Sequence, residues 1–263
     1  MGIMEAAERH VMILKAPAED PEDDGRDPYS HLLRENGFAV TSVPVIDFEF
    51  CNLEELRDCL QAPHKFSGII FTSPRAVRAT ALGLGTDQRL PARWSQHAFF
   101  VVGRSTAAAL RSSLGAEGEG AESGSAVALA DYITQRSYAG PLLYPCSSLQ
   151  RGTLPARLQE RGVRAHCVTA YATVPHPGLE RSLALALASS RPPGFLVYFS
   201  PSGVAASLPV LRGLQLPFHR LKVIAIGAAT QAALERSDVP VWAVCKEPTP
   251  EQLLSRLSSP GPS

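Results

Sequence analysis

The 263-residue sequence lacks an excess of charge of either sign, because 25 Lys and Arg residues match 25 Asp and Glu residues. A zero net charge argues against a strongly basic nucleic-acid-binding face, although it is compatible with a local basic pocket. Long apolar runs are lacking as well. No stretch approaches the ~20 residues of a membrane span, and the N-terminus does not fit a signal peptide. We therefore expect a protein that binds neither nucleic acid nor a membrane.

The cysteine and histidine patterns of common metal sites are also absent. The five Cys residues occur without a CxxC pair, and the seven His residues occur without an HExxH spacing. This argues against a disulfide framework and against a zinc site, and an odd, unpatterned set of cysteines predicts reduced core thiols in a cytosolic protein. No GxGxxG, GxxxxGKS, GxxxxGKT or GxSxG motif occurs, so nucleotide binding and an α/β-hydrolase active site have no support.

What the sequence does contain is an internal repeat. Residues 71–77 return as residues 198–204, an offset of 127 residues, and residues 99–110 return as residues 223–234, an offset of 124. Each copy has an apolar strand pattern that opens into a helix start rich in small residues. A duplication of this size predicts two similar domains of about 125 residues each. Their paired strand ends predict a site in the cleft between the domains.

Strand and helix patterns alternate along both copies. Short buried-strand patterns, such as those at residues 67–71 and 195–199, are each followed by helical patterns. Gly37 and Gly162 take equivalent places after a helix, in the C-cap role. This alternation predicts βαβ units, and therefore an α/β fold with parallel sheets.

Two long extended stretches bear on the domain boundaries, because they lie at equivalent places in the repeat and contain several prolines. If both cross between the domains, the first domain is discontinuous, and a two-stranded connector would let the domains hinge. Periodicity leaves two sequential domains as the alternative. The discontinuous division predicts domain 1 at residues 1–45 and 175–260, an inserted domain 2 at 49–167, linker strands at 43–50 and 168–177, an irregular leader at 1–9, and a flexible tail at 258–263.

Hydroxyl groups gather where strands of the two copies meet helix starts. Thr72 and Ser73 follow one strand, and Ser200, Ser202 and Gly203 follow the matching strand. A helix N-terminus offers unpaired N–H donors and a favourable dipole to a carboxylate or phosphate. Ligands of open parallel sheets also bind beyond the carboxyl ends of the strands. The plainer alternative is an N-cap role, for which Ser and Thr are preferred, and the repetition makes the two interpretations comparable.

A second matched pair combines a glycine with a threonine. Gly103 precedes Thr106 in the first copy, and Gly227 precedes Thr230 in the second. The glycine permits close approach of a ligand, and the threonine can cap a helix or donate a hydrogen bond. Tight helix–sheet packing by small residues is the alternative, above all for the Ala-rich second copy.

Tyr171 and three arginines complete the candidates. Tyr171 lies in the second extended stretch, where a phenol could donate to a leaving oxygen or act as a general acid, although most tyrosines are amphipathic packing residues. Arg75, Arg104 and Arg151 each lie beside a candidate loop and could pair with carboxylates bidentately. Each could equally be an ordinary surface residue.

Taken together, these residues resemble the uroporphyrinogen-III synthase family of heme biosynthesis, over essentially all of residues 10–257. Overall sequence similarity within this family is low, so many short matches in the right order are a specific signal. The closeness of the match indicates a vertebrate-type member. The matching segments are residues 27–29, 70–77, 101–103, 142–146, 171–173, 176–178, 199–203, 225–227 with Thr230, and 247–250.

The resemblance implies two flavodoxin-like domains joined by a two-stranded β-ladder, and a monomeric cyclising lyase without metal or organic cofactor. The family converts hydroxymethylbilane, the product of hydroxymethylbilane synthase, to uroporphyrinogen III. Ring D is inverted and water is lost through a spiro-pyrrolenine intermediate. Tyr171 matches the tyrosine proposed to assist departure of the hydroxyl group. The eight substrate carboxylates would be held by backbone N–H groups and by the hydroxyls of Thr72, Ser73, Ser200, Ser202 and Thr230, while Arg151 follows the family's loop after the strand at 142–145.

Three places depart from the family pattern. Ser147 stands where relatives commonly carry Gly, Ala229 replaces a commonly hydroxylated neighbour of Thr230, and Arg104 with Ser105 replaces a less charged pair. A rival from another class is a noncatalytic two-lobed binding protein for a small polyanion, which would bind hydroxymethylbilane without converting it. A flavodoxin-like FMN protein is a third alternative, which a colourless purified protein would exclude.

Overall fold

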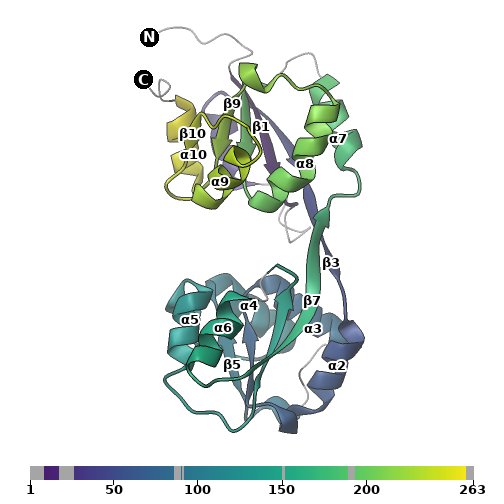
Figure 1. Cartoon of the computed structure of the whole chain (residues 1–263), viewed down its shortest axis with the longest axis vertical. Coiled ribbons are helices and arrows are strands. Elements are labelled where there is room, and N and C mark those ends of the chain that lie inside the picture. The colour runs from purple at the N-terminus through teal and green to yellow at the C-terminus, as the bar shows by residue number, and fades with distance from the viewer. Residues whose placement is uncertain are drawn as a thin grey trace. The chain divides into compact units, whose positions relative to one another are not determined.

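The computed structural model describes residues 9–17, 27–85, 90, 92–149, 152–188 and 193–258. The chain divides into two compact units: unit 1 comprises Met1–Asp47 with Val174–Ser263, and unit 2 comprises Phe48–Thr173 (Figure 1). The predicted leader, except Arg9, and the predicted tail, except Ser258, lie outside the described residues. Ser258 is the last residue of helix α10 (Pro250–Ser258), so it belongs to a helix rather than to the tail.

The unit boundaries fall within two strands, β3 (Ile46–Phe50) and β7 (Ala165–Pro175). Most of the segment at 168–177 therefore counts with unit 2. The segment at 43–50 is interrupted at Val45, between the end of β2 and the start of β3.

Unit 1 contains a five-stranded sheet in the order β10-β9-β8-β1-β2. All described pairs of neighbouring strands are parallel. The inner strand β1 is buried along nearly its whole length, as expected for a parallel strand that is covered on both faces. The strands are β1 (His10–Lys15), β2 (Ala39–Pro44), β8 (Phe195–Tyr198), β9 (Lys222–Ala225) and β10 (Ala243–Val244).

Helices cover both faces of this sheet (Figure 1). Leu33 of α1 (Pro28–Glu35) and Leu253 of α10 share one core cluster with Val11 and Ile13 of β1. The other helices of the unit contact the sheet at β2, β8 and β9. They are α7 (Leu179–Ala188), α8 (Pro201–Gly213) and α9 (Ala228–Glu235).

Unit 2 contains a second five-stranded sheet, in the order β3-β7-β6-β4-β5. Its core has two clusters, one against α2, α3 and α4 and one against α5 and α6. Beyond β3 and β7, the strands are β4 (Gly68–Phe71), β5 (Ala98–Val101) and β6 (Leu142–Ser147). The helices are α2 (Leu53–Gln61), α3 (Pro74–Leu84), α4 (Gly103–Leu114), α5 (Ala126–Ile133) and α6 (Thr153–Glu160).

The two sheets share one arrangement but differ in chain order. In unit 1 the strands lie in the flavodoxin-like order 2-1-3-4-5. In unit 2, β7, β6, β4 and β5 take the places of β2, β1, β8 and β9, so four strands repeat the arrangement in a permuted chain order, and β3 is added beside β7. The predicted α/β fold is confirmed, with two five-stranded sheets in which parallel pairing dominates. The topological switch point, where ligands bind in such sheets, lies between β1 and β8 in unit 1 and between β6 and β4 in unit 2.

Local sequence signals account for the ends of several helices. Gly37 and Gly162 have φ angles of +80° and +78°, which confirms their predicted role after α1 and α6, because glycine adopts this region without steric cost. Ser125 caps α5, its side chain accepting from Ala128 N. Strand β6 extends to Ser147, two residues beyond the predicted end at 145, because Cys146 and Ser147 continue to pair with β7.

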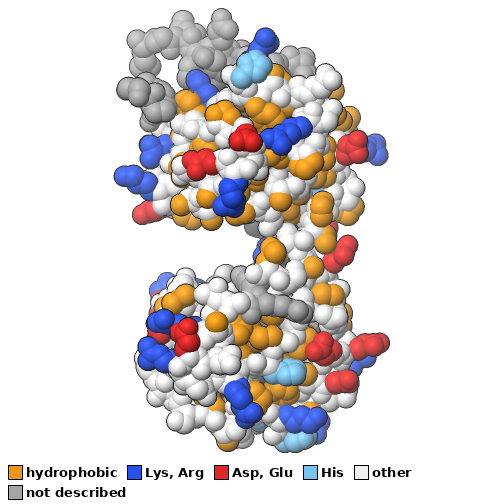
Figure 2. Space-filling view, in the orientation of Figure 1, with side chains coloured by type: hydrophobic (Ala, Val, Ile, Leu, Met, Phe, Trp, Pro, Cys, Tyr) orange, Lys and Arg blue, Asp and Glu red, His pale blue; other side chains and the backbone are white. Residues whose placement is uncertain are grey.

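The surface carries charges of both signs. Figure 2 shows acidic and basic side chains interspersed on the face that it presents. Several form ion pairs, such as Arg111 with Glu117 at 2.6 Å. In the part of the chain that the structure describes, no helix combines the length and apolarity needed to cross a membrane.

Candidate active site

A polar cluster lies at the switch point of unit 2, where β4 and β6 end side by side. Strand β4 ends at Phe71, and Ser73 then caps α3, its hydroxyl accepting from Ala76 N at 3.2 Å. The same Ser73 oxygen lies 2.8 Å from the phenol oxygen of Tyr171 in β7. The capping interpretation of Ser73 is therefore correct, but the cap also contacts the candidate catalytic phenol.

Tyr171 is buried, with 3% of its surface exposed. Burial raises the pKa of its phenol, whereas the hydroxyls of Ser73 and Ser147 and the positive charge of Arg75 act to lower it, and the net pKa is above the ordinary value of 10.0. The phenol therefore keeps its proton at neutral pH. It can donate that proton to a leaving oxygen, as general-acid chemistry requires.

A second phenol–hydroxyl pair involves the neighbouring residue in the connection between β4 and α3. The phenol oxygen of Tyr144 in β6 lies 3.2 Å from the hydroxyl oxygen of Thr72. Tyr144 is 1% exposed, and burial raises the pKa of its phenol. Sequence analysis treated Tyr144 only as part of a strand motif. The available signal was a tyrosine in an otherwise apolar buried strand, where a phenol usually finds a hydrogen-bond partner.

Arg75 lies in the first turn of α3, beside the cluster. Its guanidinium carbon is 3.6 Å from the centroid of the Phe48 ring, within the range of a cation–π interaction. A guanidinium pairs with a carboxylate through the N–H groups at its edge. Stacking of its face on the Phe48 ring leaves this edge available for the expected pairing.

The start of α4 lies beside this cluster. Val102 N donates to Phe71 O at 3.0 Å, which brings the ends of β5 and β4 together. Gly103 has a φ of +80°, and a Cβ atom placed on it would meet nothing within 4 Å, so the backbone is open to close approach. Thr106 is 1% exposed. Among the described residues, no hydrogen bond links Gly103 or Thr106 to Tyr171.

The strand ends of unit 1 carry the other predicted residues. Ser200 caps α8, its hydroxyl accepting from Gly203 N at 3.0 Å. A Cβ atom on Gly203 would lie 3.1 Å from Val45 Cγ2, so this glycine also serves close packing. Ser202 lies in the first turn of α8, and Thr230 lies buried in α9. Arg151 falls outside the described residues.

A charged pair in unit 1 is not evident from the sequence alone. Lys15 at the end of β1 lies 2.5 Å from a carboxylate oxygen of Asp27, and Asp27 also caps α1 by accepting from Ser30 N at 3.1 Å. Burial acts to raise the pKa of Asp27, but the hydrogen bonds from Lys15 and Ser30 together outweigh it and lower the pKa below its ordinary value of 3.8. The pair could not be found by periodicity, because its two members come from different elements.

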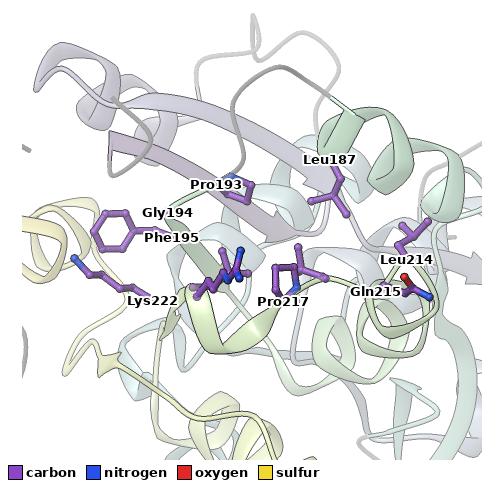
Figure 3. A pocket seen from close by; sticks show the side chains of 11 residues that line it. Leu187, Pro193, Gly194, Phe195, Leu214, Gln215, Pro217 and Lys222 are labelled. Carbon is purple, nitrogen blue, oxygen red and sulfur yellow. The ribbon is translucent and has the colours of Figure 1, made fainter. Parts of the chain in front are cut away.

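A cavity of about 440 Å³ in unit 1 opens at the opposite ends of the strands. Figure 3 shows it beside the starts of β8 and β9, with Phe195 and Lys222 on one side and Leu187 and Pro217 opposite. No predicted site residue is among its described lining residues. Because ligands of parallel α/β sheets bind at the carboxyl ends of the strands, this cavity is not the candidate active site.

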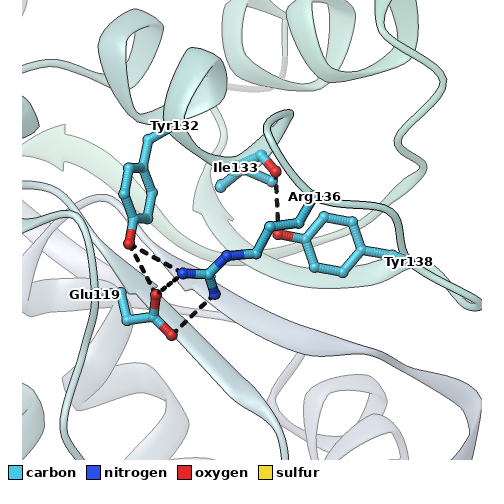
Figure 4. Close-up of polar contacts among 5 residues, drawn as sticks. All are labelled: Glu119, Tyr132, Ile133, Arg136 and Tyr138. Atoms are coloured by element: carbon cyan, nitrogen blue, oxygen red, sulfur yellow. Dashed lines mark hydrogen bonds and ion pairs between the residues drawn. The ribbon is translucent and has the colours of Figure 1, made fainter.

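A further polar cluster in unit 2 has a structural role. Arg136 donates to both carboxylate oxygens of Glu119, at 3.2 and 2.6 Å, and Tyr132 donates to Glu119 at 2.9 Å (Figure 4). The hydrogen bonds from Arg136 are the main reason why the pKa of Glu119 is lowered. Glu119 forms a parallel bridge with Phe100 of β5, so the cluster attaches the segment after α4 to the sheet. Arg104 is likewise paired with Glu122 at the surface.

The fold and the site define an α/β protein of two flavodoxin-like units, with hydroxyl donors and a protonated phenol at the strand ends. A family model described as uroporphyrinogen-III synthase HemD matches residues 27–255. The chain belongs to the uroporphyrinogen-III synthase family, the cyclising lyases of heme biosynthesis, which act on a tetrapyrrole.

Solved structures agree in fold. The uroporphyrinogen-III synthetase of Helicobacter pylori is similar with a TM-score of 0.60 and 17% identity, over 94% of this chain and 97% of that chain. A mutant uroporphyrinogen III synthase of Thermus thermophilus is similar with a TM-score of 0.56 and 21% identity, over 93% and 96% of the two chains. At these identities the likeness concerns the fold, and the family membership rests on the family model.

Proposed function

We propose that the substrate is hydroxymethylbilane, supplied by hydroxymethylbilane synthase, and that the product is uroporphyrinogen III. Loss of the terminal hydroxyl gives an azafulvene electrophile. The substituted α-carbon of ring D attacks it to form a spiro-pyrrolenine, which fragments and recloses with ring D inverted. One water molecule leaves and no electrons are exchanged, so the proposal needs no redox cofactor.

Tyr171 carries this proposal. A buried phenol with a raised pKa, 2.8 Å from the Ser73 hydroxyl, is a neutral proton donor at physiological pH. In the proposed step it gives its proton to the departing hydroxyl as the carbon–oxygen bond breaks, so that water leaves. The proton that the pyrrole finally releases on ring closure restores the phenol. The reactive pyrrole is already electron-rich, so folding the substrate and one assisted proton transfer are sufficient.

The proposed carboxylate donors are neutral groups at the strand ends of each unit. Hydroxyls and helix N-terminal N–H groups bind anions without adding net charge, which agrees with the equal counts of acidic and basic residues. Arg75 would add one cation in unit 2, and Arg151 would follow β6. The proposed donors are Thr72, Ser73, Gly103 and Thr106 in unit 2 and Ser200, Ser202, Gly203 and Thr230 in unit 1. We propose further that the enzyme is a cytosolic monomer that uses neither a metal nor an organic cofactor.

A coupled assay tests the proposed reaction. Freshly made hydroxymethylbilane is given to the purified protein without added cofactor, and the porphyrin isomers are separated after oxidation. An excess of type III over type I establishes ring inversion. Type I alone, the spontaneous product, would contradict the proposal and leave a binding protein as the better interpretation.

A further inference from the structure

The pairing of β6 with β7 is irregular beside the candidate catalytic phenol. The two strands pair residue by residue from Leu142 with Ala165 to Cys146 with Thr169. The next pair is Ser147 with Tyr171, so Ala170 is an extra residue of β7 at this point. Such a β-bulge bends the strand and re-aims the side chain that follows it.

The bulge changes the face on which Tyr171 lies. Val168 and Ala170 belong to the core cluster on the α3 side of the sheet, whereas Cys167 packs against the cluster on the opposite side. Strict alternation would therefore place Tyr171 on the side of Cys167. Tyr171 instead belongs to the α3-side cluster, where Ser73 contacts its phenol.

Ser147 lies on the same face without any change of register. Along β6, Leu143 belongs to the α3-side cluster, and Tyr144 and Cys146 belong to the opposite one. Alternation places Ser147 with Leu143, and therefore beside Tyr171, its partner in register. Ser147 is 5% exposed. Just beyond it, Ser148 N donates to Tyr171 O at 3.1 Å, which fixes the backbone of both strands at this point.

We propose that Ser147 is a positioning residue for Tyr171, holding the phenol oxygen from β6 while Ser73 holds it from the start of α3. This inference rests on the proposed role of Tyr171 as the proton donor. The Ser73 oxygen bonds the phenol while it also accepts the capping N–H of Ala76. Ser147, paired in register with Tyr171, adds a second hydroxyl that restrains the phenol from β6. Two neutral hydroxyls do this without adding a charge that would ionise the phenol.

The test compares Ser147→Ala with Ser147→Thr, which keeps the hydroxyl, and with Ser148→Ala, which removes the neighbouring exposed hydroxyl. Tyrosine labelled with ¹³C at the ring Cζ is titrated by NMR, and the resonance of Tyr171 is assigned by its loss in Tyr171→Phe. Because the Ser147 hydroxyl lowers the pKa of Tyr171, Ser147→Ala should move this titration to higher pH.

Turnover should follow the titration. For Ser147→Ala we expect kcat to fall about three- to tenfold, the worth of one hydrogen bond, with KM within about twofold of wild type. Ser147→Thr should restore both the titration and kcat, and Ser148→Ala should leave both unchanged. Thermal unfolding checks that each variant is folded.

Two results would overturn the inference. In the first, Ser147→Ala shows the same Tyr171 titration and the same kcat as the control Ser148→Ala. In the second, Ser147→Thr loses as much as Ser147→Ala, which would assign the effect to packing. The titration does not depend on activity. Full turnover by Tyr171→Phe would therefore refute the proposed proton donor, while the NMR comparison would still decide whether Ser147 holds the phenol.

Discussion

The two units carry different side chains at equivalent positions of two similar sheets. At the switch point of unit 2, the central strand β6 ends in Ser147, paired in register with Tyr171. In unit 1, the corresponding strand β1 ends in Lys15, paired in register with Pro44. Duplication has thus retained the sheet and the capping serines, while one switch point holds neutral hydroxyls and a phenol and the other holds an ion pair.

The register explains why only one of these ends carries a phenol in this position. Strands β1 and β2 pair regularly over six residue pairs, from His10 with Ala39 to Lys15 with Pro44. The corresponding pairing of β6 with β7 contains the bulge at Ala170. A regular register leaves no means to turn an additional side chain toward the helix that follows the neighbouring strand. Under the proposed role of Tyr171, proton transfer belongs to unit 2.

Removing the Tyr171 phenol should have the largest effect on turnover. We expect Tyr171→Phe to lower kcat about 100-fold, because general acid catalysis contributes at least this much, and to change KM far less, because the ring remains. Steady-state kinetics with hydroxymethylbilane measure both. The matched control is Tyr198→Phe in unit 1, another buried phenol, whose pKa is raised by burial to about 12. It should retain wild-type kcat, and equal kcat values for the two variants would contradict the comparison.

The next largest effect should distinguish the two capping serines, Ser73 and Ser200, in their kinetics. Ser73→Ala and Ser200→Ala each remove an N-cap, at a cost of about 1 kcal/mol in the free energy of unfolding. Only Ser73 also contacts Tyr171, so Ser73→Ala should lower kcat about tenfold, whereas Ser200→Ala should chiefly raise KM. Urea unfolding and steady-state kinetics check the two effects. The same kcat loss in both variants would show that capping alone matters.

The ion pair of unit 1 should matter for stability and its pH dependence. Asp27→Asn keeps a side chain that can cap α1 but leaves Lys15 without its partner carboxylate, at a cost of about 1–2 kcal/mol at pH 7. The pKa of Asp27 is lowered in the folded protein. Its contribution is therefore complete above the ordinary pKa of 3.8 and is lost as the pH falls through the lowered value. Unfolding measured from pH 7 to well below pH 3.8 should show the free energies of unfolding of the variant and the wild type converging below 3.8; a constant difference would contradict this origin.

The smallest effect on stability is expected at the sheet edge beside β9 in unit 1 and beside β5 in unit 2. Beside β9, unit 1 has strand β10; beside β5, the described residues of unit 2 form the bridge of Glu119, which the exposed Arg136 holds. Glu119→Gln should lower Tm by less than Asp27→Asn does, because exposed ion pairs contribute little. The difference should shrink in high salt. A larger loss than that of Asp27→Asn would mean that this bridge matters more to unit 2 than its exposure suggests.

Much of the fold was predictable because its signals are local. The capping hydroxyls of Ser73, Ser200 and Ser125 and the glycines after α1 and α6 act within about four residues of their own position. Part of the candidate site followed from the same signals, since a cap at a strand end of a parallel sheet lies where ligands bind. Tyr171 was a candidate from its place in the second extended stretch, and the family resemblance gave it a specific role. Its contact with Ser73, 98 residues away in the chain, was not predictable.

The sequence by itself determined the alternating elements, the duplication, the balance of charge and the serines that start the helices. These depend on residue type and short spacing. Only the tertiary structure decided that unit 2 is a permuted copy of the sheet, that a bulge turns Tyr171 toward α3, and that Tyr144 and Ser147 join the cluster. The physical reason is that register and facing are set when strands from distant parts of the chain pack together, and a shift of one residue reverses the face of every side chain that follows.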